Sequence, residues 1–105
     1  MTTNNRLAKD RIINALGDLY RIEKHSNLTA ARKKNVQTAI AALEAEYVGL
    51  LGVNADTGYR AVTAGFKAAE NALKDIKSER DKLANAFISA SKILGSVTKV
   101  LNLLA

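Results

Sequence analysis

The feature that most constrains this chain is an unbroken apolar repeat in its second half. From Tyr59 to Leu104, fourteen positions follow one another in alternating steps of three and four residues, and thirteen of them are apolar. The exception is Arg80. Such spacing places side chains on one stripe of an α-helix and is typical of coiled coils. Because the phase is kept across the charged stretch LKDIKSERDKLA (73–84), we predict one continuous helix over about residues 57–104.

The alternative is a break near Ser78 that divides this region into two helices, because helices longer than ~25 residues are uncommon in small domains. The composition favours helix in either case. There is no proline, and alanine, which has the highest helix propensity, occurs eighteen times. We therefore expect an all-α fold, with residues 1–105 forming a single helical domain.

The amino-terminal half carries two shorter apolar stripes. One predicts a helix over about residues 5–25, and the other predicts a helix over about residues 29–51. Between them lies HSNLT (25–29), whose side chains hydrogen-bond to their own backbone and favour a break. After the second helix, the stretch GVNADTG (52–58) predicts a loop, because Gly52 is a plausible helix stop.

The two halves on either side of this loop are nearly equal in length. They predict an antiparallel helical hairpin in which the long carboxyl-terminal helix packs on the two shorter helices. In that register, facing residues have numbers that sum to about 109, so Leu43 meets Phe66 and Leu16 meets Leu94. Arg80 faces the break between the two shorter helices. A compact three- or four-helix bundle is the alternative.

A hairpin of this kind buries only one stripe per helix, yet the sequence has more apolar residues than one stripe holds. At about 25 cal/mol per Å², leaving the remainder in water would cost several kcal/mol. We therefore expect the hairpin to complete its core as a homo-oligomer, with another protein as a further possible partner. The candidate self-association residues are Phe87, Ile88, Leu94, Val97, Leu101 and Leu104.

The charge of the chain is uneven. The net charge is +6, and residues 1–34 alone contribute eight basic and three acidic side chains, a net of +5. The candidate anion-binding residues in this region are Arg21, Lys24, Arg32, Lys33 and Lys34. They could neutralise phosphates without reading a sequence, so nucleic-acid binding through the basic amino-terminal third is an alternative function. We favour a solvated basic face, because no recognition helix or stacking surface accompanies them.

The carboxyl-terminal segment 83–105 has only two charges, Lys92 and Lys99, which lie on one helix face. Such a basic amphipathic helix could bind an anionic membrane surface, and peripheral membrane binding is the second alternative function. It is a poor spanning segment, because two lysines would enter the hydrocarbon. We favour a core helix, since the apolar repeat continues in phase through it.

The sequence favours no catalytic or cofactor site. It has no cysteine, its one histidine is His25, and the motifs HExxH and GxSxG do not occur. We therefore expect no enzyme activity, no cofactor and no metal, and a surface position for His25. Without a signal peptide or a spanning segment, we expect a cytoplasmic protein. The leading hypothesis is a small non-enzymatic protein–protein interaction or assembly module.

Overall fold

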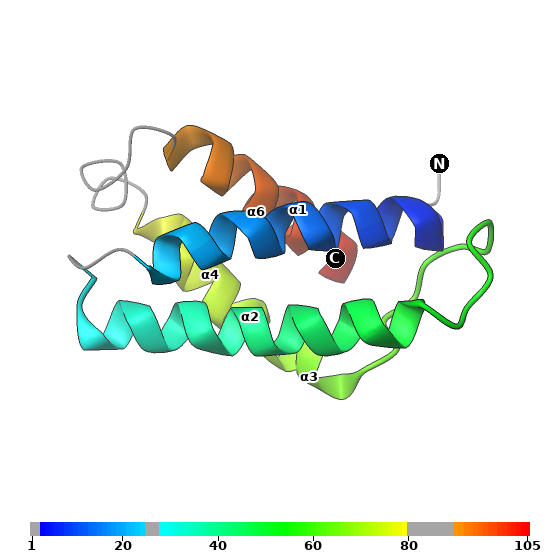
Figure 1. Cartoon of the computed structure of the whole chain (residues 1–105), viewed down its shortest axis with the longest axis horizontal. Helices are drawn as coiled ribbons and strands as arrows, with labels where there is room; N and C mark the ends of the chain where they lie inside the picture. Colours follow the sequence, from blue (N-terminus) through cyan, green and yellow to red (C-terminus); the bar gives the residue numbers. More distant parts are fainter. Residues whose placement is uncertain (1–2, 25–27, 80–89) are drawn as a thin grey trace.

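The computed structural model describes residues 3–24, 28–79 and 90–105, and these residues form helices joined by loops. The helices are α1 (Asn5–Glu23), α2 (Ala30–Leu50), α3 (Ala64–Ala68), α4 (Glu70–Ser78) and α6 (Ala90–Leu104). Only Ala69 separates α3 from α4, so the globule consists of four helical stretches packed together (Figure 1). Within the described residues there is no strand, and the all-α prediction is confirmed. The arrangement is the compact four-helix alternative and not the open hairpin.

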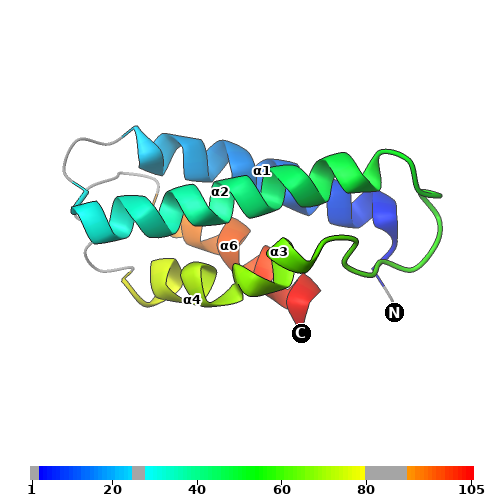
Figure 2. The same cartoon turned by 90° about the horizontal axis from the view of Figure 1, so that it is seen from below.

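The first two helices lie where the sequence predicts them, and the break between them is confirmed. Each begins at a side-chain cap. Asn4 Oδ1 accepts a hydrogen bond from the Leu7 amide at 2.8 Å, and Thr29 Oγ1 accepts one from the Arg32 amide at 3.3 Å. α1 and α2 run antiparallel along the length of the molecule (Figures 1 and 2).

The predicted continuous helix over 57–104 is wrong. Helical structure begins only at Ala64, α4 ends at Ser78, and α6 packs back against both α1 and α4. A helix of the predicted length would measure about 70 Å at ~1.5 Å per residue. The whole molecule measures 40 × 23 × 20 Å, so the chain cannot contain it. Arg80, the polar exception in the repeat, lies outside the described residues.

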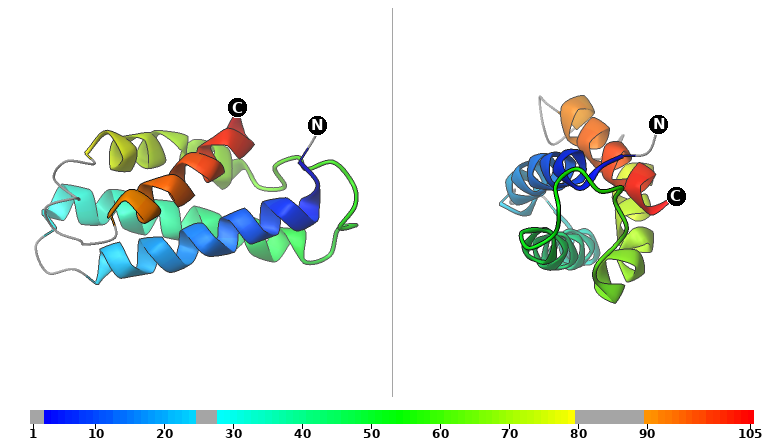
Figure 3. Two further views of the ribbon diagram at one scale, coloured as in Figure 1. Left: turned by 90° about the horizontal axis from the view of Figure 1, so that it is seen from above. Right: turned by 90° about the vertical axis from the view of Figure 1, so that its right-hand side faces the viewer.

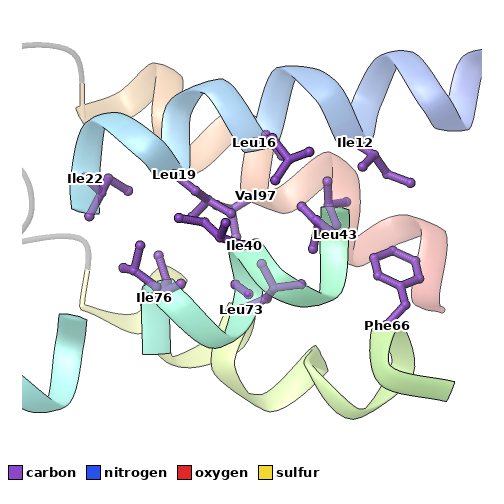
Figure 4. Packing of buried hydrophobic residues seen from close by; sticks show 14 of the residues in the cluster. Ile12, Leu16, Leu19, Ile22, Ile40, Leu43, Phe66, Leu73, Ile76 and Val97 are labelled. Carbon is purple, nitrogen blue, oxygen red and sulfur yellow. The ribbon is translucent and has the colours of Figure 1, made fainter. Parts of the chain in front are cut away.

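The apolar repeat keeps its phase because both of its described segments face one core. Leu73 and Ile76 of α4 and Val97 of α6 are all buried there (Figure 4). The pairing of the hairpin register also holds in outline, since α2 packs on α3 and α4 and α1 packs on α6. The chain is folded once more, so that α1 also meets α2 and α4 meets α6. Seen end-on, the helices surround a common centre (Figure 3).

This extra fold explains where the surplus apolar surface goes. Ile12 and Leu19, which widen the stripe of α1, are both 0% exposed within the single chain. α1 therefore buries, within the single chain, the wider stripe that an open hairpin would leave in water.

Candidate functional site

A buried carboxylate fixes the loop that follows α2. Glu46, on α2, is 0% exposed, and its two oxygens accept four hydrogen bonds from residues 59–63. Oε2 accepts from the Tyr59 hydroxyl at 2.6 Å and the Val62 amide at 2.8 Å. Oε1 accepts from the amide and hydroxyl of Thr63 at 2.9 and 2.7 Å. A buried carboxylate costs several kcal/mol unless it is paired or hydrogen-bonded, and these four donors meet that requirement.

The surroundings of Glu46 also act on the Tyr59 hydroxyl. Burial raises the pKa of Tyr59 well above the usual range for tyrosine, and the hydrogen bond to the carboxylate raises it further. Both effects favour the neutral phenol, which is the form that can donate. Tyr59 therefore acts as a structural hydrogen-bond donor at neutral pH.

The loop fits closely against α2 and also caps α1. A Cβ at Gly49 would lie 2.5 Å from Cγ2 of Val62, so only glycine allows this approach. At the other side, the carbonyl oxygens of Thr57 and Ala55 accept hydrogen bonds from the Asn5 and Arg6 amides at 2.9 and 3.0 Å. The first amides of α1 are thus satisfied by the loop.

A second buried carboxylate lies where α1 meets α6. Asp18 is 5% exposed, and its Oδ2 accepts a hydrogen bond from the Ser96 hydroxyl at 2.5 Å. Its Oδ1 lies 3.3 Å from Nη1 of Arg21, whose side chain is 64% exposed. Asp18 therefore joins α1 to α6 through a residue that is 78 positions away in the sequence.

Beside Asp18 lies an open hollow of about 510 Å³, which we call the α1–α6 groove. Its lining residues come from these two helices: Ile13, Asn14, Gly17, Asp18, Arg21, Lys92, Gly95, Ser96 and Lys99. Of these described residues three are cationic and one is anionic, so together they carry a net charge of +2. Both glycines leave open space where a Cβ would stand.

On another side of α1, apolar side chains remain exposed between α1 and α2. A hollow of about 390 Å³ there is lined by Ile13, Leu16, Gly17, Tyr20, Glu44, Tyr47 and Val48. The Tyr20 hydroxyl donates a hydrogen bond to Glu44 across it. The same hydrogen bond, together with slight burial and nearby carboxylates, raises the pKa of Tyr20. Leu51, one turn beyond Val48, is 58% exposed.

The predicted self-association residues fall into three groups. Phe87 and Ile88 lie outside the described residues. Val97 is 0% exposed and has no surface left for a second copy. Leu94, Leu101 and Leu104 are partly buried against the core of their own chain. Their role in association stays a prediction.

The predicted anion-binding residues are only partly brought together. Arg21 lies in the α1–α6 groove, whereas Arg32 forms an ion pair with Glu79. Lys24 is the C-cap of α1, and Lys33 and Lys34 are exposed near the beginning of α2. Anion binding by these three lysines stays a prediction. His25 lies outside the described residues.

The predicted membrane face of the carboxyl-terminal helix also meets the core. Val97 and Val100, both 0% exposed, lie on the apolar side of α6. Lys92 and Lys99 are exposed, as their positions on one helix face predict, but they line the α1–α6 groove. In the described part of the chain, no helix has the length and apolar character needed to cross a bilayer.

Sequence reasoning missed both buried carboxylates, although each had a detectable signal. Glu46 is spaced three and four residues from Leu43 and Leu50, on the buried stripe of α2. Asp18 stands in the same relation to Ala15 and Ile22 on α1. A lone acid within an apolar stripe is the pattern that could have identified them.

Within residues 3–24, 28–79 and 90–105, no group of three or more metal-ligating side chains comes together. No family model, curated protein or solved structure matches this chain.

Proposed function

We propose that this chain is a non-enzymatic helical interaction module that works as a symmetric homodimer. The interface we propose is the α1–α2 face, defined as Lys9, Ile13 and Tyr20 of α1 with Glu44 and Val48 of α2 and its C-cap residue Leu51. The observation that carries the proposal is the exposure of its apolar members. Ile13 is 46% exposed, Val48 is 65% exposed and Leu51 is 58% exposed.

These residues differ from the apolar residues that face the core, such as Ile12, Leu19 and Val97, which are 0% exposed. Exposed apolar side chains that cluster beside a hollow and have a polar rim are typical of protein interaction sites. Covering them contributes about 25 cal/mol per Å² of apolar surface. A second helical surface of the same kind could fill the hollow between α1 and α2.

The charges of the α1–α2 face favour a second copy as the partner. Lys9 lies one helical turn before Ile13, at one end of the face. Glu44 lies beside Tyr20, at the other end. Because Lys9 and Tyr20 are eleven residues apart on α1, these ends are separated by roughly 16 Å.

A two-fold axis through the middle of the face reverses its direction in the second copy. Each Lys9 then lies near the second copy's Glu44, and the apolar side chains meet in the centre. Opposite charges at the two ends thus support a two-fold pairing and disfavour a parallel one, in which like charges would meet.

The test is the molar mass in solution, measured by light scattering at about 100 µM. A monomer has a mass of 11.3 kDa, so the dimer should give about 23 kDa. Lys9→Glu and Glu44→Lys should each shift the chain toward the monomer, because each places like charges together. The double variant Lys9→Glu/Glu44→Lys should restore the dimer, since it exchanges the charges without removing the pair.

Leu7→Lys is the matched control, because Leu7 is a 42% exposed residue of α1 on a different helix face. It should leave the mass unchanged. A wild-type mass of 11.3 kDa at this concentration would contradict the proposal, as would a double variant that stays monomeric while folded.

A further inference from the structure

The α1–α6 groove brings together cations that are far apart in the sequence. Arg21 comes from α1, whereas Lys92 and Lys99 come from the last helix of the chain. All three are exposed at the groove. No carboxylate occurs anywhere in α6, and the one acid among the described lining residues, Asp18, is held by Ser96 and shares an ion pair with the exposed Arg21. The groove therefore offers positive charge at its rim.

The spacing of these cations suits a linear polyanion. Lys92 and Lys99 are seven residues apart, which corresponds to roughly 10 Å along α6. A nucleic-acid strand in a duplex carries one phosphate per ~3.4 Å of helix axis. A strand lying along the groove would therefore pass about three phosphates between the two lysines, with Arg21 on the opposite wall.

Two glycines in the lining of the groove leave room for a ligand to approach the helix backbones closely. Gly17 of α1 and Gly95 of α6 both lie in helix interiors, where glycine costs about 0.5–1 kcal/mol relative to alanine. Neither glycine is required by packing, because a Cβ at either position would meet no atom within 4 Å. The bare backbone instead leaves the floor open beside the amide of Asn14 and the hydroxyl of Ser96.

We propose that the α1–α6 groove binds the sugar-phosphate backbone of a nucleic acid. Lys92 and Lys99 neutralise phosphates about three positions apart on the strand, and Arg21 neutralises one from the α1 side of the groove, while Asn14 offers a hydrogen-bond donor to the backbone. Among the described lining residues none has an aromatic side chain on which a base could stack. Binding is therefore independent of base sequence and driven by counterion release. The groove adjoins the proposed dimer interface and shares Ile13 with it, but none of its three cations belongs to that interface.

Two other polyanions fit the groove less well. A membrane surface would require apolar side chains that insert beside the lysines, but the apolar side of α6 is turned into the core at Val97 and Val100. An acidic peptide has carboxylates at variable positions, whereas a phosphate backbone repeats its charge along a regular line. Such a regular line of charge matches Lys92 and Lys99, which lie seven residues apart on one face of α6.

The test is fluorescence anisotropy with a labelled 20-base-pair duplex of mixed sequence, at 50 and 200 mM salt. With three phosphates neutralised, the logarithm of affinity falls with a slope of about −2.7, so affinity should drop roughly 40-fold over this range. Lys92→Gln/Lys99→Gln leaves one contact, so its affinity should drop only three- to fourfold. At 50 mM salt the variant should bind more weakly than the wild type.

Lys67→Gln/Lys77→Gln is the matched control, because it removes the same charge from exposed positions on α3 and α4. It should retain the steep salt dependence. The proposal is overturned if both double variants lose affinity and slope equally, since the effect would then be one of net charge alone. It is also overturned if the wild type binds vesicles of phosphatidylcholine with one quarter phosphatidylserine, or polyglutamate, but not the duplex.

A second measurement locates the site without substitution. In an amide-correlation NMR titration with the unlabelled duplex, the signals of Gly17 and Gly95 should shift more than that of Gly65, which lies on α3. Equal shifts at all three glycines, or shifts at Gly65 alone, would refute binding in the groove.

Discussion

The two buried carboxylates of the described residues stabilise different kinds of contact. Glu46 is completely enclosed, accepts four hydrogen bonds from one loop, and lies near Gly49, where the loop leaves no room for a methyl group. Asp18 has two partners, one of them an exposed arginine, and lies beside an open groove with room at both glycines. The first region is closed by its own chain. The second is held together and yet remains accessible, which is what a binding surface requires.

Among the substitutions that compare these two regions, replacing Glu46 should lower the free energy of unfolding the most. Glu46→Ala leaves four donors without an acceptor in a buried site, and we expect the free energy of unfolding to fall by about 3 kcal/mol. Urea denaturation followed by circular dichroism measures this loss. Asp18→Ala should cost less, about 1–2 kcal/mol, because the exposed Arg21 can turn to water. If the two losses are equal, the contrast between closed and open regions does not hold.

A methyl group should distinguish the glycines of the two regions. Gly49→Ala forces Val62 away from α2, so we expect a loss of about 1–2 kcal/mol despite alanine's better helix propensity. Gly95→Ala meets no atom and should raise stability by about 0.5–1 kcal/mol. Thermal unfolding of the two variants and the wild type measures both the expected loss and the expected gain of stability. A stabilised Gly49→Ala variant would show that the loop can move away from α2 at no cost.

The Tyr59 hydroxyl should make the stability of the region around Glu46 depend on pH. Its pKa is raised in the folded state, so the folded protein keeps this proton at a pH where the unfolded chain, with a pKa of about 10, loses it. This contribution to stability is therefore complete below about pH 10 and is lost as the pH rises further. Solvent screening limits the effect at this half-buried group to about 1 kcal/mol between pH 9 and pH 11.

Tyr59→Phe should be about 1 kcal/mol less stable at pH 8, because one donor to Glu46 is lost. It should also show a smaller fall in stability between pH 9 and pH 11 than the wild type. Lysine titration is common to both proteins, so the difference between them isolates Tyr59. Parallel falls in the two proteins would contradict the assignment.

The helices of the amino-terminal half could be predicted because their signals are local. The apolar period, the stretch HSNLT (25–29) as a break and Gly52 as a stop all act within a few residues. The prediction of one long helix is wrong because a three-four repeat indicates which side chains share a buried face. It does not indicate how many helices carry that face. Between α3 and α4 the interruption at Ala69 has no side-chain cap, and no proline marks the end at Ser78.

The candidate sites needed information that no local pattern contains. Glu46 could be recognised as a lone acid on the stripe between Leu43 and Leu50. Its donors, however, come from the path of a loop, and the partner of Asp18 lies 78 residues away. The groove cations were likewise visible singly, but only the packing of α6 on α1 places Lys92 and Lys99 opposite Arg21.

The loop that caps α1 has a consequence for how the molecule comes apart. The Tyr59 amide donates to the Thr3 carbonyl at 2.7 Å and Asn5 donates to Thr57, so the first sixty residues return to their own beginning and form a closed ring. α6 packs against α1, which is part of this ring, and none of the hydrogen bonds that close the ring comes from α6. The α1–α6 groove runs along this junction between ring and last helix. A bound polyanion would hold both sides of that junction and so slow the detachment of the chain's last helix.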